Sequence, residues 1–92
     1  MANAIATIRI MPETVEVDLH KIEKQAMVMV KEFAGEGDTR VNIVPIAFGL
    51  KALDITFIMD ESLGSPEPLE LKIATIEGVN SVETTDVRRA VG

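Results

Sequence analysis

The stretch of residues 44–60 constrains the fold more than any other part of the chain. From residue 53 onward an apolar side chain recurs at every second position, which is typical of a β-strand with one face on a hydrophobic core. The apolar positions of this pattern are Leu53, Ile55, Phe57 and Met59. Upstream, Pro45 interrupts strand pairing and Gly49 permits a chain reversal. The stretch therefore predicts a strand, a tight turn at residues 47–50 and a long central strand.

Three further strands are predicted at residues 4–11, 40–46 and 79–87, the last with the weakest alternation. Between the first two of them, apolar residues recur at spacings of three and four, which predicts an amphipathic helix. We expect this helix to begin after Asp18, a suitable N-cap, and to end at Gly35. Its apolar stripe consists of Leu19, Ile22, Ala26, Met29, Val30 and Phe33.

A second helix is predicted to follow the central strand. Ser65 is its expected N-cap, Pro66 takes the first helical position, and Gly78 is expected to cap its end. Its apolar stripe consists of Leu69, Ile73 and Ile76. The element order is thus β-α-β-β-α-β, in which each helix connects two parallel strands of one sheet.

Right-handed crossovers place both helices on the same face of such a sheet. The predicted fold is therefore a ferredoxin-like α/β sandwich (the α+β class), with a four-stranded antiparallel sheet and two helices on one face. The chain has 92 residues, which is enough for one core, so we expect residues 1–92 to form a single domain. Because this fold hosts many functions, the function must be inferred from a site.

Composition and charge exclude several classes of function. The absence of Cys excludes disulfides, thiol catalysis and cysteine metal sites. The net charge of −6 opposes nucleic-acid binding, and three Phe are too few for a base-stacking platform. The sequence contains no apolar run of the length that a signal peptide or a membrane span needs. We therefore expect a cytoplasmic protein without nucleic-acid or membrane partners.

No catalytic constellation is recognisable in the sequence. His20 is the single histidine and has no partner at metal-ligand spacing, and Asp54 is expected to be a solvated acid. The pair of Gly35 and Gly37 lacks the further glycine and the strand–helix context of a dinucleotide site. Neither a nucleophile elbow nor a phosphate-binding lysine loop is present. We therefore expect no enzyme chemistry, no cofactor and no direct binding of GTP.

Two features remain as candidates for binding. Phe48, beside Gly49, is predicted to project from a hairpin tip, and the alternative is that its ring folds back onto the helix-free face of the sheet. Arg88 and Arg89 follow the last strand, and the alternative is a pair of solvated charges that blunt a strand end. The pattern leaves open whether the arginines and the Phe48 turn are neighbours.

Three blocks of the sequence resemble one family in the right order. Residues 45–53, P-I-A-F-G-L-K-A-L, resemble the signature of the nucleotide-exchange domain of translation elongation factor 1-beta. Residues 6–13 resemble its opening strand and residues 84–89 its closing strand, in the short single-domain form of archaeal members. The resemblance implies a monomeric guanine-nucleotide exchange factor. Such a factor promotes GDP release from elongation factor 1-alpha, binding its GDP-bound and nucleotide-free forms, so that GTP can reload it.

The resemblance also implies roles for particular residues. Phe48 matches the aromatic residue that inserts into an apolar pocket of the partner, and Pro45, Gly49 and Lys51 match positions that shape or flank the turn. In eukaryotic members a lysine near the carboxyl end reaches the partner's magnesium and phosphate site. The corresponding residues 90–92 are A-V-G, without lysine. Either Arg88 or Arg89 supplies the positive charge instead, or the hairpin works largely alone.

A different class of protein remains as the alternative. Residues 76–82 form a helix-Gly-Val-strand junction that is common in small ferredoxin-like regulatory modules of the amino-acid-binding kind. Such modules dimerise and hold a small ligand between their sheets. A stable dimer in solution favours this ligand-binding module, whereas a monomer favours the exchange factor.

Overall fold

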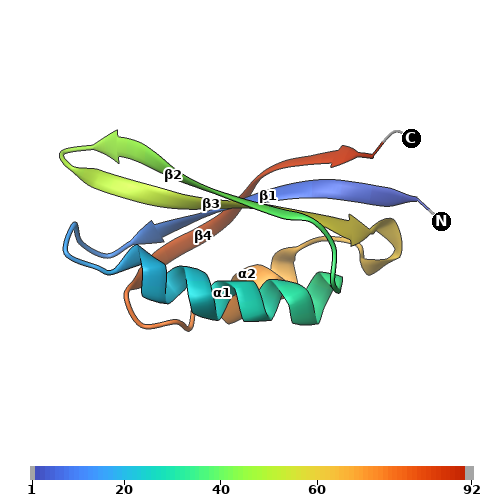
Figure 1. Cartoon of the computed structure of the whole chain (residues 1–92), viewed down its shortest axis with the longest axis horizontal. Helices are drawn as coiled ribbons and strands as arrows, with labels where there is room; N and C mark the ends of the chain where they lie inside the picture. The colour runs from blue at the N-terminus through green and yellow to red at the C-terminus, as the bar shows by residue number, and fades with distance from the viewer. Residues whose placement is uncertain (1, 91–92) are drawn as a thin grey trace.

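The computed structural model describes residues 2–90 and has the predicted order of elements (Figure 1). The strands are β1 (Asn3–Pro12), β2 (Thr39–Ala47), β3 (Leu50–Asp60) and β4 (Val79–Arg89). The helices are α1 (Leu19–Ala34), the short 3-10 turn η1 (Glu61–Leu63) and α2 (Glu67–Ile73). Every predicted strand is present and extends one to three residues beyond its predicted bounds.

The four strands form one sheet in the order β2-β3-β1-β4, and each neighbouring pair is antiparallel. Figure 1 shows α1 and α2 side by side on one face of this sheet, while the other face carries no helix. The predicted ferredoxin-like α/β sandwich is therefore confirmed. The molecule is elongated, with extents of 42 × 22 × 18 Å, because the β2–β3 hairpin continues past the helical layer at one end.

The core lies between the sheet and the helices, and it consists of the positions that the periodicities predicted. The alternating apolar residues of β3 are buried, namely Leu53, Ile55, Phe57 and Met59. On α1, Ile22, Ala26 and Val30 are buried, whereas Leu19, Met29 and Phe33 of the predicted stripe are only partly buried. The rings of Phe33 and Phe57 meet edge-on with centroids 6.5 Å apart, a favourable aromatic geometry. Asp18 caps α1 as expected, since its Oδ1 accepts a hydrogen bond from the amide of His20 at 2.9 Å.

The end of α2 differs from the prediction. The helix stops at Ile73, well before Gly78, and the chain continues through turns in which the amides of Thr75 and Ile76 bond to carbonyls three residues earlier. This tighter winding still buries Ile76, which is why the apolar spacing suggested a longer helix. The start of α2 also differs by one residue, because Pro66 and not Ser65 is the N-cap and Glu67 is the first helical residue. The Ser65 hydroxyl, one position before the cap, accepts a hydrogen bond from the amide of Glu67 at 3.1 Å.

The helix-free face carries polar pairs between neighbouring strands. Arg9 on β1 donates two hydrogen bonds to the Asp54 carboxylate on β3, at 2.9 and 3.0 Å. Hydrogen bonding to Asp54, together with the charge of that carboxylate, raises the pKa of Arg9. The expectation that Asp54 is a merely solvated acid was therefore wrong, because a strand register joins it to a residue far away in the sequence. No helix within residues 2–90 is long and apolar enough to cross a membrane.

Candidate partner-binding surface

The β2–β3 hairpin ends in a two-residue loop formed by Phe48 and Gly49. Ala47 and Leu50 pair across it, and both loop residues have positive φ angles, 53° for Phe48 and 79° for Gly49. Positive φ at both positions is the pattern of the type I′ turn, whose twist matches that of the flanking strands. The predicted turn at residues 47–50 is thus confirmed.

Phe48 is in an unfavourable position by two separate criteria. Its side chain is 102% exposed, so the ring projects into solvent and does not fold back onto the sheet. It is also the one non-glycine residue with a positive φ among residues 2–90, a conformation that disfavours residues carrying a Cβ by about 1–2 kcal/mol. Neither property contributes to packing. A strained and fully exposed ring is therefore a candidate for binding.

The strand leading to the tip is irregular at Ile46. Pro45 pairs with Lys51, but the next pair is Ala47 with Leu50, so that Ile46 is an extra residue on β2. Such a bulge increases the local twist and redirects side chains. Pro45 and Lys51 are exposed and lie next to the bulge. Pro45 is accommodated because β2 is an edge strand, on which a missing amide can face solvent.

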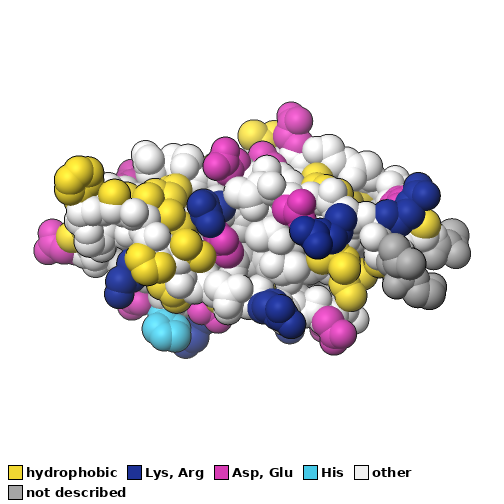
Figure 2. Space-filling view, turned by 90° about the horizontal axis from the view of Figure 1, so that it is seen from above, with side chains coloured by type: hydrophobic (Ala, Val, Ile, Leu, Met, Phe, Trp, Pro, Cys, Tyr) yellow, Lys and Arg dark blue, Asp and Glu magenta, His cyan; other side chains and the backbone are white. Residues whose placement is uncertain are grey.

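A second segment reaches the hairpin tip from the loop of residues 13–18 between β1 and α1. A Cβ placed on Gly49 would lie 3.8 Å from Cγ1 of Val15, so this valine adjoins the turn. The Val15 side chain is 61% exposed. Sequence reasoning missed it, since a single valine in a loop belongs to no periodic pattern. Figure 2, which views the helix-free face, shows hydrophobic and acidic side chains together at this end of the molecule.

Arg88 and Arg89 lie at the opposite end of the sheet. They pair with Ile5 and Ala4 at the start of β1, whereas the hairpin tip extends beyond the end of β1, where Ile10 pairs with Leu53. Figure 1 shows the two ends clearly, with the hairpin at the left and the last strand ending at the right. The two arginines and the Phe48 turn are therefore not neighbours.

Both arginines are engaged by carboxylates. Arg88 donates to Asp86 at 2.8 Å, and Arg89 donates two hydrogen bonds to Glu61, at 2.7 and 3.2 Å. Hydrogen bonding to Glu61, reinforced by its charge, raises the pKa of Arg89. These contacts leave the end of β4 close to electrically balanced. Residues 90–92 take the place of the segment that carries a lysine in eukaryotic members. Val91 and Gly92 of this segment lie outside the described residues.

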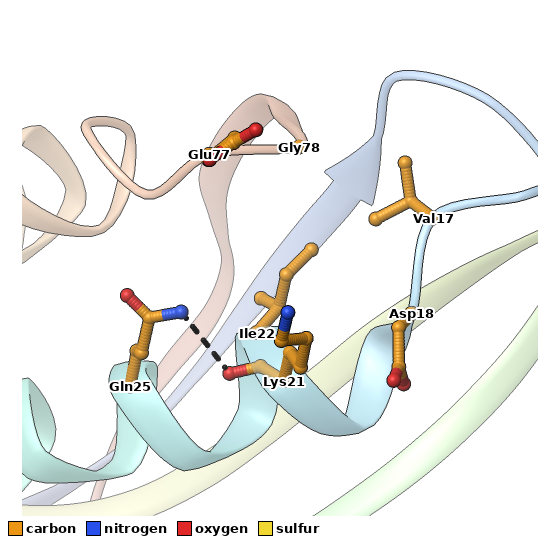
Figure 3. Close-up of a pocket in the computed structure, with 7 residues that line it drawn as sticks. All are labelled: Val17, Asp18, Lys21, Ile22, Gln25, Glu77 and Gly78. Carbon is orange, nitrogen blue, oxygen red and sulfur yellow. Dashed lines mark hydrogen bonds between the residues drawn. The ribbon is translucent and has the colours of Figure 1, made fainter.

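The surface also has a groove near the start of α1, away from the two arginines. The groove in Figure 3 has a volume of about 300 Å³ and lies between the start of α1 and the turn before β4. Its polar groups are already used in part, because Asp18 caps α1 and Gln25 donates to the carbonyl of Lys21. His20 is exposed, and its Nδ1 lies 3.9 Å from Oε1 of Glu23. Within residues 2–90, no cluster of His, Cys, Asp or Glu could hold a metal ion.

Solved structures of similar shape establish the fold alone. The chain resembles a de novo designed protein, Foldit4, with a TM-score of 0.64 and 19% identity over 98% of both chains. It also resembles the protein titled BlrP1 BLUF, with a TM-score of 0.57 and 13% identity, covering all of this chain and 57% of that one. At such low identities, no function is transferred.

Curated proteins named elongation factor 1-beta are similar over nearly the whole chain. The protein of Methanothermobacter thermautotrophicus is 38% identical, over 97% of this chain and 98% of its own length. That of Methanosarcina barkeri is 40% identical over 97% and 99%, and that of Staphylothermus marinus 36% over 97% and 98%. Residues 5–90 match the family described as the EF-1 guanine nucleotide exchange domain. The chain belongs to this family of guanine nucleotide exchange domains.

Proposed function

We propose that this chain promotes the release of GDP from elongation factor 1-alpha and its reloading with GTP, with the β2–β3 hairpin tip as the principal contact. The single observation that supports the hairpin most directly is Phe48, whose ring is fully exposed on a strained backbone. Membership of the exchange-domain family supplies the activity. The family also favours this function over the dimeric ligand-binding module, and we propose that the chain acts as a monomer.

Exchange of this kind requires differential binding and no bond chemistry. A factor that binds the nucleotide-free partner better than the GDP-bound partner weakens GDP binding by the same ratio, because the two affinities are thermodynamically linked. Each tenfold preference corresponds to about 1.4 kcal/mol. The proposed function therefore needs contacts that fit one conformation of the partner, and it needs no proton donor, nucleophile or metal from this chain.

The hairpin tip has the properties of such a contact. An exposed aromatic ring buries a large area when it enters a pocket, and aromatic residues are common among the side chains that dominate binding energy. The two-residue loop is short, so that little conformational freedom is lost when it binds. In this proposal Phe48 enters an apolar pocket, while Pro45, Gly49 and Lys51 hold or flank the turn that presents it.

The test is the release of a fluorescent GDP from an archaeal elongation factor 1-alpha, followed after addition of excess unlabelled GDP. We expect the wild-type chain to accelerate release at least about tenfold, with saturation as its concentration rises. Sedimentation of the same sample should give the mass of a monomer. A folded chain that leaves the release rate unchanged at saturating concentration would exclude the proposed function. A stable dimer would instead revive the ligand-binding module.

We propose that Arg88 and Arg89 make a second, weaker contact from the other end of the sheet. Because Asp86 and Glu61 already compensate their charges, we expect Arg88→Ala/Arg89→Ala to raise the half-saturating concentration only about two- to fivefold. The difference should shrink as salt is raised toward about 0.5 M, since exposed charges are screened. The measurement is the same GDP-release titration at two salt concentrations. A loss of maximal rate, independent of salt, would instead give these arginines the role of the missing lysine.

A further inference from the structure

The loop of residues 13–18 is fixed in place by several contacts, although its tip is exposed. At its start, the amide of Glu13 donates to the carbonyl of Gly78 at 2.9 Å. At its end, Val17 packs closely on Gly78, and Asp18 caps α1. Figure 3 shows Val17 and Gly78 among the residues that line the groove between α1 and the turn before β4. The loop is therefore held at both ends.

This fixed loop presents Val15 beside the hairpin turn. The valine is 61% exposed, although it lies within van der Waals distance of a Cβ placed on Gly49. Ile46, at the bulge, is 43% exposed, and Phe48 completely so. Two segments that are separate in sequence thus place three exposed apolar side chains at one end of the molecule. We call Val15, Ile46 and Phe48 the tip surface.

Self-association is a poor explanation for the tip surface. A symmetric tip-to-tip dimer would bury on the order of 800 Å² in total from these three residues, below the roughly 1,200 Å² typical of a stable interface. It would also bring Glu13 and Glu16 of one copy toward those of the other, in a chain of net charge −6. A narrow apolar projection flanked by acidic groups instead suits a pocket in a different protein.

We infer that Val15 is a further partner-binding residue, which enters the same apolar pocket of elongation factor 1-alpha as Phe48. This inference depends on the proposed function. Val15 belongs to the loop that follows β1, so the pocket would be contacted from two sides of the turn. A residue in this role contributes to affinity for the partner, and it has no effect on the fold of the free chain.

The test compares Val15→Ser with Val28→Ser in the GDP-release titration. Val28 is 58% exposed on α1, so the control removes the same side chain at nearly the same exposure. We expect Val15→Ser to raise the half-saturating concentration about three- to tenfold, with the maximal rate unchanged. Val28→Ser should behave as wild type. Val15→Ile, which keeps an apolar side chain, should remain within about twofold of wild type.

The possible outcomes separate the two proposals. If wild type accelerates release and Val15→Ser titrates like Val28→Ser, Val15 is no contact and the proposed function stands. If wild type does not accelerate release, both proposals fail. The φ angles of Phe48 and Gly49, measured by NMR, should be the same in wild type and Val15→Ser. If the turn of the free variant is changed, the effect of Val15→Ser is indirect and the proposed contact of Val15 with the partner is overturned. The same holds if wild type is a dimer that Val15→Ser dissociates.

Discussion

Phe48→Ala is expected to lower the second-order rate constant for GDP release at least about 30-fold, while the free energy of unfolding changes by less than about 0.5 kcal/mol. The first number corresponds to about 2 kcal/mol, which is the loss expected when a dominant aromatic contact is truncated. The second follows from burial, because a ring that is fully exposed has no packing to lose. The two measurements are the GDP-release titration and a urea unfolding curve.

Two further variants separate the ring from the turn. Phe48→Gly also removes the ring, but it relieves the positive φ and should leave the hairpin as stable as before or slightly more so. We expect it to be as inactive as Phe48→Ala. Leu71→Ala removes an apolar side chain that is 66% exposed on α2, and it should retain full activity. If Phe48→Gly exchanged nucleotide at the wild-type rate, the hairpin tip would not be the contact.

The parts of the fold that could be predicted are those fixed by local patterns. The alternation of β3 could be read directly because a strand with one buried face repeats every two residues. The cap at Asp18 and the turn at Gly49 also depend on near neighbours in sequence alone. The end of α2 was predicted less well, because a tighter turn and an α-helix bury nearly the same apolar positions, as Ile76 illustrates.

The exposure of Phe48 was predictable from the sequence, but the arrangement of the candidate site residues was not. Phe48 stood out because a turn rarely carries an aromatic residue, and the structure confirms that its ring projects outward. Which residues meet across the sheet depends on strand register, which the sequence does not state. That register places Arg88 and Arg89 at the end of the sheet away from the hairpin tip. It also brings Arg89 to Glu61. The position of Val15 beside Gly49 likewise depends on a tertiary contact.

Gly78→Ala is expected to lower the free energy of unfolding by about 2–4 kcal/mol, a large loss for the addition of one methyl group in a turn. Gly78 has a φ of 95°, where a Cβ adds strain of about 1–2 kcal/mol. In addition, the new Cβ would lie 2.9 Å from Cγ1 of Val17. Valine is short and stiff, so it cannot rotate away easily, and the loop of residues 13–18 or the turn before β4 must shift. Urea unfolding measures the loss.

The matched control is Gly35→Ala, at a φ of 87° with no atom within 4 Å of the added Cβ. Because this variant bears the backbone strain alone, we expect Gly78→Ala to be less stable than it by about 1–2 kcal/mol. Adding Val17→Ala to Gly78→Ala should recover part of the difference, which a double-mutant cycle measures as a coupling energy. Equal losses in the two glycine variants, with no coupling to Val17, would show that backbone strain alone makes Gly78 necessary. A measured coupling would instead identify close packing of the loop on this glycine as a source of stability, and it would connect the turn before β4 to the loop that presents Val15 at the hairpin tip.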